Sequence, residues 1–358
     1  MTEIAQRGAE SLPGLLTDEH LDRLAPADRA ALLAQAFIAK FPNPNTRAAY
    51  GKDLFLWFAF CRDAGLEPLT DPKPLHGDLW LRWLAEPHPG LYWPATGAGA
   101  APKPVEASSA RSIARRVSPV SNWYEWLDAN EYSDRRPFLT VKRPKVNKSA
   151  QHGVALSPKQ AAAMLDAVAT DKDARANRPR NLAALWVLLG SGVRGGELAS
   201  IGTDDFAVRR GQRLLIVREG KGSKSRVIPL HDDALDAVDA WMLVRPGAKP
   251  GPLLTTSTGK ALDHKAVWRL VRRAARLAAK ARPELGMKHI AATIAPHDTR
   301  RTYITVALDD GANIDHVARD AGHASTDTTL IYDQNRDAVE RSVALDVGKL
   351  IADARLHP

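Results

Sequence analysis

The sequence predicts a protein of two domains that is mainly α with a small antiparallel β-sheet. Apolar residues recur at helical spacing through most of the 358-residue chain, and the stretch 205–230 carries short strand patterns joined by turns. A basic segment poor in apolar residues divides the chain into two regions, each long enough to bury its own core. We therefore expect an N-terminal all-helical domain and a C-terminal α+β domain.

The N-terminal domain is expected at 15–141, after a flexible N-terminus at 1–14. Its clearest helix runs from Asn45 to Asp63, because a proline start signal precedes a single apolar stripe. The stripe consists of Tyr50, Leu54, Trp57, Phe58 and Cys61. Other helical segments are expected over 15–40, at 76–85, from Ser108 or Ser109, and over 120–130. The stretch 87–106, rich in Pro, Gly and Ala, has the composition of an extended surface insertion.

The segment 142–152 is expected to link the two domains. Its positive side chains are Lys142, Arg143, Lys145 and Lys148. They could follow a phosphate backbone, or the segment could be a solvated hinge, and the composition fits both interpretations.

The C-terminal domain is expected at 153–358. It opens with Ser157-Pro158-Lys159-Gln160, which supplies an N-cap, a proline at the first helical position and a capping-box partner. This helix is expected to reach about Val168, and a second one covers 181–189. Strands are then expected at 205–209, 213–218 and 225–230, with helices from there to the end.

Gly190, Gly192 and Gly195 match the spacing of a dinucleotide-binding loop. That loop follows a strand, whereas the preceding LAALWVLL is rich in Leu and Ala, which favour a helix. We therefore expect no dinucleotide site. The run from Gly220 to Ser223 lacks the earlier glycine of a P-loop, so no nucleotide triphosphate site is expected there.

The composition indicates the cellular location of the protein and the kind of molecule that it binds. The net charge of +9 and the pI of about 9.6 favour binding to polyanions. The single cysteine, Cys61, cannot form an internal disulfide or a thiolate zinc site, so a reducing cytoplasm is the expected location. The sequence contains no apolar run of about 18 residues, and its start lacks a secretory pattern, so no membrane association is expected.

Several polar residues of the C-terminal domain suit the exchange of phosphodiester bonds. This reaction needs a nucleophile, positive donors around the phosphate oxygens and an acid for the leaving oxygen. The candidates are Arg194, Lys221, His297, Arg300, His323 and Tyr332. If helical, His297 and Arg300 share one face. The sequence shows no convincing carboxylate cluster, so no metal or other cofactor is expected.

The order of these residues resembles the tyrosine recombinase (phage integrase) family. The matching strings are VRGGELASI, EGKGSKSRVIPL, PHDTRRTYIT and GHASTDTTLIYD. NTRAAYGKDLFLWFAFCRDAG is similar to the first helix of the family's core-binding domain. The resemblance implies a DNA-binding core-binding domain at 15–141 and a catalytic domain of the tyrosine recombinase type at 153–358. It implies an enzyme that cleaves and rejoins DNA strands through a 3′-phosphotyrosine.

Carried over position by position, the resemblance implies a role for each candidate. Tyr332 is the expected nucleophile, and Arg194 and Arg300 are the expected clamp on the scissile phosphate. The expected general acid for the 5′ oxygen is Lys221. His297 is expected to assist proton transfer from the tyrosine. His323 is expected to contact the phosphate. Glu197 and Asp204 are expected to support Arg194, the first arginine of the pattern.

The sequence departs from the family pattern beside these positions. Thr299 and Ala321 stand where leucine is usual, and Arg301 stands where histidine is frequent. None of the three is a catalytic position, so the departures are interpreted as packing variation.

The resemblance also implies double-stranded DNA as the substrate, a homotetramer at synapsis, and accessory DNA-bending or directionality proteins. A type IB topoisomerase-like DNA-relaxing enzyme would use the same nucleophile. A non-catalytic DNA-binding protein of the same fold is a further alternative. The presence of the expected residue type at every catalytic position argues against this last alternative.

Candidate DNA contacts lie on basic segments of both domains. The expected helix 263–281 has one apolar face and one basic face. The candidates are Arg111, Arg115, Lys142, Arg143, Arg269, Arg272 and Arg276. After Tyr332, a helical apolar stripe is formed by Val339, Val343, Val347, Leu350 and Ile351. In the family such a tail docks on a neighbouring protomer, and packing within its own domain is the other interpretation.

Overall fold

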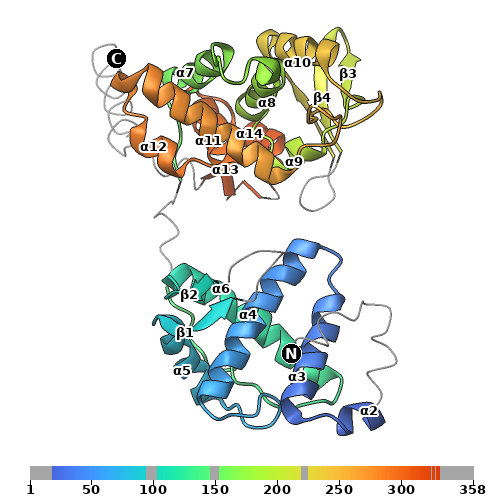
Figure 1. The fold of residues 1–358 in the computed structure, drawn as a ribbon, viewed down its shortest axis with the longest axis vertical. Coiled ribbons are helices and arrows are strands. Elements are labelled where there is room, and N and C mark those ends of the chain that lie inside the picture. The colour runs from blue at the N-terminus through green and yellow to red at the C-terminus, as the bar shows by residue number, and fades with distance from the viewer. Residues whose placement is uncertain are drawn as a thin grey trace, which may run out of the picture. The chain divides into compact units, whose positions relative to one another are not determined.

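The structure, a computed structural model, describes residues 18–93, 103–145, 153–218, 225–323, 325–326 and 328–330. The chain divides into two compact units, Met1–Asn147 and Lys148–Pro358 (Figure 1). Most of the described residues are helical, and the strands form small antiparallel sheets. The predicted fold class is therefore confirmed.

The N-terminal unit packs its helices around an aromatic core. The helices are α2 (Asp18–Asp22), α3 (Pro26–Ala39), α4 (Pro44–Asp63), α5 (Pro74–Leu84) and α6 (Ala110–Ala129). Trp57 of α4 is fully buried, and its ring lies edge-on to those of Trp80 and Tyr124. The Trp57 indole N–H donates to the Tyr124 hydroxyl at 2.9 Å, and that hydroxyl donates to the Pro68 carbonyl at 2.7 Å. The core thus keeps the polar atoms of these two rings satisfied.

Two features of this unit differ from the sequence prediction. The expected separate helices from Ser109 and over 120–130 are one continuous helix, α6, which contains a buried Pro119. Burial along its whole length offsets the backbone hydrogen bond that proline removes. In addition, the unit is not entirely helical, because the predicted surface insertion contains the antiparallel strands β1 (His88–Trp93) and β2 (Lys103–Val105).

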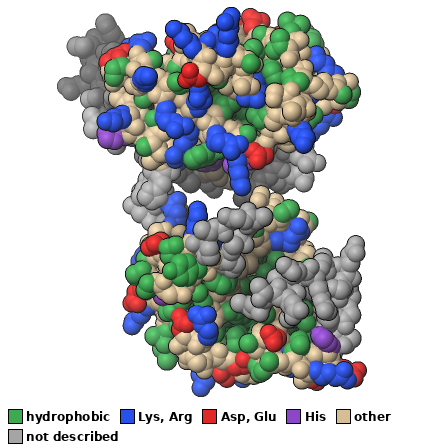
Figure 2. Space-filling model, in the orientation of Figure 1, with side chains coloured by type: hydrophobic (Ala, Val, Ile, Leu, Met, Phe, Trp, Pro, Cys, Tyr) green, Lys and Arg blue, Asp and Glu red, His purple; other side chains and the backbone are tan. Residues whose placement is uncertain are grey.

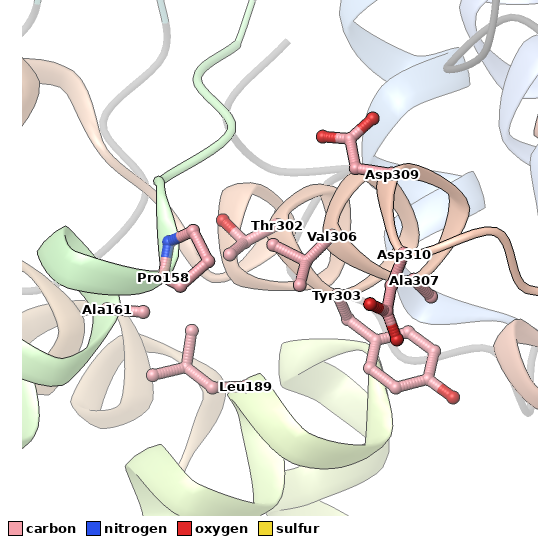
Figure 3. A pocket seen from close by; sticks show the side chains of 9 residues that line it. All are labelled: Pro158, Ala161, Leu189, Thr302, Tyr303, Val306, Ala307, Asp309 and Asp310. Atoms are coloured by element: carbon pink, nitrogen blue, oxygen red, sulfur yellow. The ribbon is translucent and has the colours of Figure 1, made fainter.

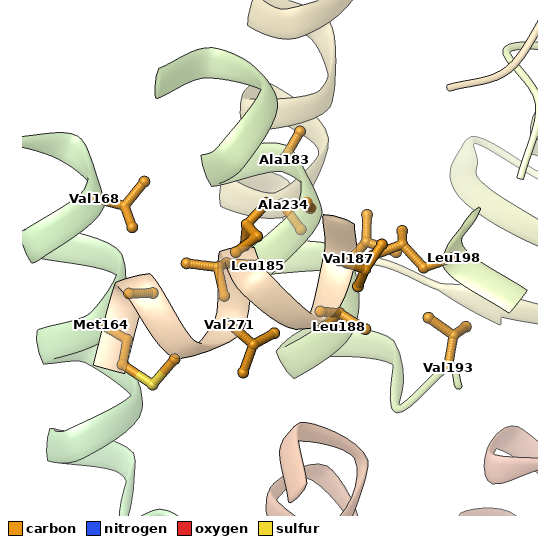
Figure 4. Close-up of a cluster of buried hydrophobic side chains, with 14 of the residues drawn as sticks. Met164, Val168, Ala183, Leu185, Val187, Leu188, Val193, Leu198, Ala234 and Val271 are labelled. Atoms are coloured by element: carbon orange, nitrogen blue, oxygen red, sulfur yellow. The ribbon is translucent and has the colours of Figure 1, made fainter. Parts of the chain in front are cut away.

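The C-terminal unit surrounds one central helix, α8 (Arg178–Ser191). Its other helices are α7 (Pro158–Ala169), η3 (Arg175–Asn177), α9 (Gly195–Ser200), α10 (Asp232–Val244), α11 (His264–Ala281), η4 (Pro283–Leu285), α12 (Lys288–Thr293), α13 (Pro296–Asp309) and α14 (Ile314–Ala321). Leu185 and Leu188 of α8 are fully buried among side chains of α7, α10 and α11 (Figure 4). The predicted capping box at Ser157 and Gln160 is confirmed at the start of α7.

The predicted three-stranded sheet is confirmed. It consists of β3 (Phe206–Arg209), β4 (Gln212–Val217) and β5 (Arg226–Pro229), in that order and antiparallel. The β3–β4 turn places Arg210 and Gly211 at positive φ, as a tight hairpin requires.

Side-chain hydrogen bonds attach α13 to the beginning of the C-terminal unit. The Asp298 carboxylate accepts from the Ala295 N–H at 2.8 Å and from the Val154 N–H at 3.0 Å. The Thr302 hydroxyl accepts from the Leu156 N–H at 2.9 Å. These bonds fix the first turns of the helix that carries His297 and Arg300.

Candidate active site

Arg194 lies in the short connection between α8 and α9 and is held by two segments. Its backbone N–H and one guanidinium nitrogen, Nη1, both donate to the Glu197 carboxylate at 2.8 Å. Its Nη2 donates to the Gly322 carbonyl at 3.2 Å, which connects it to the turn after α14. Arg194 is therefore fixed between its own short helix and the turn that precedes His323.

Arg300 reaches the same connection from α13. The predicted helix across His297 and Arg300 is confirmed. The Arg300 side chain is fully buried, and its Nη1 donates to the Gly192 carbonyl at 3.0 Å. His297 stands exposed on the first turn of the same helix. Arg300 thus binds the connection between α8 and α9, which is the segment that carries Arg194.

The glycine pattern that resembles a dinucleotide loop has a packing explanation. Gly192 ends α8 at φ +62°, and a Cβ placed on it would lie 2.5 Å from Cδ1 of Tyr303. A Cβ on Gly195 would lie 2.7 Å from Cβ of Pro296. Tyr303 and Pro296 both belong to α13, so the glycines allow the Arg194 segment to approach this helix closely. The helix predicted before them is confirmed as α8.

His323 follows Gly322, the residue at φ +64° that caps α14. The ring nitrogen Nδ1 of His323 lies 2.7 Å from the hydroxyl of the buried Thr329. If that hydroxyl donates the proton, Nδ1 is the acceptor and the neutral ring carries its proton on Nε2. Sequence analysis did not select Thr329, since a threonine in this segment carries no distinctive signal.

Desolvation by nearby protein atoms and positive neighbours keep the pKa values of both histidines low, although His297 remains accessible to solvent. Burial, followed by the charges of Arg300 and Arg194, lowers the pKa of His323 from 6.5 to about 4. The surrounding protein, followed by the charges of Arg300 and Arg301, also lowers the pKa of His297. The hydrogen bonds of Arg194 to the Gly322 carbonyl and of Arg300 to the Gly192 carbonyl bring these two arginines close to His323.

Arg226, the first residue of β5, is a further member of the cluster that sequence analysis missed. Its buried guanidinium donates to both oxygens of Glu197, from Nη2 at 2.7 Å and from Nη1 at 3.2 Å. Of the two acidic residues expected beside Arg194, Glu197 makes that contact. Asp204 instead pairs with Arg218 at 3.0 Å. The predicted support of the first arginine by Asp204 is therefore wrong.

Two candidates cannot be placed. Lys221 and Tyr332 lie outside the described residues, as does the apolar stripe of the C-terminal tail. Within the described part of the chain, no group of His, Cys, Asp or Glu side chains is arranged to hold a metal ion. Across the same residues, no helix is long and apolar enough to cross a membrane.

The candidate DNA contacts of the C-terminal unit lie on α11, where Lys and Arg side chains gather on the face seen in Figure 2. Arg269 and Arg276 are exposed. Arg272 is half-buried, and its guanidinium lies over the Trp268 ring at 4.3 Å from the centroid. The neighbouring Arg273 is engaged in an ion pair with Asp171 at 2.8 Å. The charge of Arg273 is therefore already paired with a carboxylate of the protein.

The candidates of the N-terminal unit are also on its surface. Arg111, Lys142 and Arg143 are exposed. Arg115 donates to the buried carboxylate of Asp53 at 2.7 Å and still exposes 52% of its side chain. The Arg115 guanidinium is thus paired with Asp53 and also accessible to the solvent.

An apolar groove of about 650 Å³ lies between α7, α8 and α13 (Figure 3). Its walls include Ala161, Leu189 and Val306, and Asp309 and Asp310 stand at the end of α13. The groove thus combines an apolar lining with acidic groups.

A family model described as the phage integrase family matches residues 155–338 of this chain. This chain belongs to the phage integrase family. It is a tyrosine recombinase, and the resemblance predicted from the sequence is confirmed.

Relatives of this tyrosine recombinase extend across most of the chain. The XerC tyrosine recombinase of Pseudomonas syringae pv. syringae is 28% identical over 293 residues, which cover 81% of this chain and 85% of the relative. The XerD tyrosine recombinase of Chlorobaculum tepidum is 27% identical over 311 residues, covering 85% and 89%.

Solved structures share the fold of this tyrosine recombinase. A XerH site-specific recombinase in a post-cleavage complex with palindromic difH substrate has a TM-score of 0.68 at 16% identity, covering 90% of this chain and 85% of the other. The Tn1549 transposon integrase in complex with transposon right end DNA has a TM-score of 0.65 at 18% identity, covering 92% and 100%. At these identities the likeness establishes the fold alone.

The low pKa of His323 yields a pH prediction. In the unfolded chain a histidine binds a proton near pH 6.5, whereas folded His323 does so only at about 4. The stability that this difference provides is complete above pH 6.5 and is lost as the pH falls towards 4. An NMR titration of the DNA-free protein, with His323→Gln to assign the signal, should show a midpoint near 4. A midpoint near the ordinary value would contradict the burial of this ring.

Proposed function

We propose that this protein is a site-specific DNA recombinase that cleaves and rejoins strands through a 3′-phosphotyrosine at Tyr332. The observation that carries the proposal is the cluster of Arg194, Arg300, His297 and His323, which three different segments of the chain bring together. Relatives named as tyrosine recombinases and structural neighbours solved with DNA support it.

In the proposed reaction, the Tyr332 hydroxyl oxygen attacks the scissile phosphorus and the 5′ oxygen leaves with a proton from Lys221. A free tyrosine has a pKa of about 10, so the attack needs positive charge nearby and a proton acceptor. Arg194 and Arg300 supply donors for the phosphate oxygens, and guanidinium groups match these oxygens with a planar fork. The low pKa of His297 leaves its ring neutral at pH 7, so it can accept the tyrosine proton.

His323 contacts the phosphate in the same proposal. If the Thr329 hydroxyl donates to Nδ1, the proton of the neutral ring is on Nε2, and this is the nitrogen that donates to the phosphate. Rejoining reverses the first step: a 5′ hydroxyl attacks the phosphotyrosine and Tyr332 leaves. Because the phosphotyrosine retains the energy of the phosphodiester, the proposed cycle needs no ATP and no metal.

A trapping experiment tests the nucleophile. Wild-type protein incubated with a pool of nicked genomic duplexes should form adducts that survive denaturation, because loss of a short fragment prevents rejoining. Tyr332→Phe should form none, while its DNA affinity stays within about twofold. Sequencing the trapped DNA identifies the target site.

The other outcomes of this experiment separate the alternatives. Absence of an adduct with wild-type protein would favour a non-catalytic DNA-binding protein. Adducts without a common sequence, together with relaxation of supercoiled plasmid, would favour a type IB topoisomerase-like enzyme.

For DNA contact, we propose that 15–141 forms the core-binding domain, 142–152 the basic linker and 153–358 the catalytic domain, which together clamp the duplex. The proposed contacts are Arg111, Arg115, Lys142, Arg143, Arg269, Arg272 and Arg276. The exposure of Arg269 and Arg276 on one face of α11 supports the proposal. Arginine side chains on such a face suit phosphate oxygens.

Charge reversal tests the role of α11. Arg272→Glu combined with Arg276→Glu should weaken DNA binding and flatten its dependence on salt, with a slope reduced by about 0.9 for each lost phosphate contact. Arg209→Glu, which reverses an exposed charge on β3 instead, is the matched control. Binding isotherms at several salt concentrations provide the measurement, and an unchanged slope in the α11 variant would refute the contact.

For assembly, we propose a homotetramer at synapsis, in which the tail after Tyr332 docks on a neighbouring protomer. The α7–α8–α13 groove suits such a tail, because its apolar walls match the tail's apolar stripe. The acidic Asp309 and Asp310 match tail cations such as Lys349 and Arg355. We also propose that accessory DNA-bending or directionality proteins take part in the reaction. We propose a cytoplasmic location, because the single cysteine is consistent with a reducing compartment.

Removal of residues 340–358 tests the docking. The deletion should abolish strand exchange between two duplexes and spare binding to a single half-site, because only the contact between protomers is lost. Val306→Asp, which places a charge on the groove wall, should reproduce this separation. Gel assays of half-site binding and of recombinant products measure both effects. Normal recombination by the truncated protein would exclude the docking role.

A further inference from the structure

Arg226 holds the carboxylate on which Arg194 depends. It is 9% exposed, and its fork of Nη1 and Nη2 contacts both oxygens of Glu197. The same two oxygens accept from Arg194, through its backbone N–H and its Nη1. Glu197 is itself only 7% exposed, so two guanidinium groups share one buried carboxylate.

The same guanidinium packs against the turn that precedes His323. Its Nε donates to the Asp320 carbonyl at 2.8 Å. A Cβ placed on Gly322 would lie 2.9 Å from Nη1 of Arg226, so the turn rests directly on this side chain. Arg194 donates to the carbonyl of that same glycine. Arg226 therefore connects β5 with the two segments that carry Arg194 and His323.

The charges of this trio have a direct consequence for a bound phosphate. Two guanidinium cations and one carboxylate leave one net positive charge. Without Arg226, the buried carboxylate of Glu197 would be compensated by Arg194 alone, and the remaining Arg194–Glu197 pair would carry no net charge. Arg194 would then offer the phosphate a charge already balanced by Glu197, in a partly buried place where such charges interact strongly.

We propose that Arg226 is a positioning residue for strand cleavage: it neutralises and orients Glu197 so that Arg194 keeps its place and its positive charge for the scissile phosphate. This inference rests on the proposed role of Arg194. It assigns to Arg226 no contact with the DNA.

The test uses the full-length protein and a nicked duplex that carries the trapped target sequence. Arg226→Met should slow adduct formation at saturating protein by roughly 10- to 100-fold, by analogy with the loss caused by removing a hydrogen-bond partner that orients a metal ligand. DNA affinity should stay within about twofold. The variant Glu197→Gln with Arg226→Met restores one net positive charge, so it should cleave roughly tenfold faster than Arg226→Met alone.

Arg245→Gln is the matched control, because Arg245 is equally buried in the same unit but donates to the carbonyls of Gly247, Ala248 and Pro252. It should cleave bound DNA at the wild-type rate even if its melting temperature falls. A similar loss of cleavage in this control would mean that general destabilisation, and not the Glu197 contact, explains the Arg226 variant.

The remaining outcomes decide the inference. A wild-type cleavage rate in Arg226→Met overturns it, and so does a double variant no faster than Arg226→Met. If Arg226→Met does not fold, Arg226→Gln replaces it, since glutamine removes the charge but can still donate hydrogen bonds to Glu197 or to the Asp320 carbonyl. A reduced rate at unchanged affinity then supports the inference, and a wild-type rate overturns it. Absence of any adduct with wild-type protein would instead overturn the proposed function, and this inference with it.

Discussion

Several guanidinium groups must be kept close together in a partly buried place, and the architecture of the site follows from this constraint. Like charges repel, and burying an unpaired charge is costly. The protein meets this cost with one carboxylate and with carbonyl dipoles. Glu197 lies between Arg194 and Arg226, and the Gly192 carbonyl accepts from the fully buried Arg300. Because Arg194 and Arg226 share this one carboxylate, these three groups keep a net positive charge for a phosphate.

This arrangement requires segments distant in sequence to approach closely. The Arg194 connection packs directly on α13, which is possible because Gly192 and Gly195 have no side chains. The turn after α14 packs on Arg226 for the same reason at Gly322. Glycine loses more conformational entropy on folding than other residues, and close backbone packing offsets that loss here. The packing of the fold and the electrostatics of the site are thus set by the same contacts.

The positive cluster also determines the state of the histidines. In the DNA-free protein, His297 and His323 are held neutral by their surroundings and by Arg194 and Arg300. A neutral imidazole can accept a proton, which an imidazolium cannot. Thr329 further fixes one nitrogen of His323. The arginines therefore contribute twice to the proposed chemistry, by binding phosphate and by keeping the histidine rings unprotonated.

The local elements and the identity of the family followed from the sequence. The apolar stripe of α4, the capping box of α7 and the helix across His297 and Arg300 depend on residues within a few positions of one another. The order of Arg194, Lys221, His297, Arg300, His323 and Tyr332 was sufficient to indicate the tyrosine recombinases. Long-range contacts decided the rest. Burial kept α6 continuous through Pro119, and the partners of Glu197 and Asp204 could not be read from spacing.

The sequence by itself determined which chemical groups this protein possesses and in what order. Only the tertiary structure decided which of them share a partner. The sequence did not predict Arg226 as a member of the site, because its partners Glu197 and Asp320 are distant from it along the chain. Helix propensity and capping act over a few residues, whereas a buried ion pair forms only where the packed core brings its two members together.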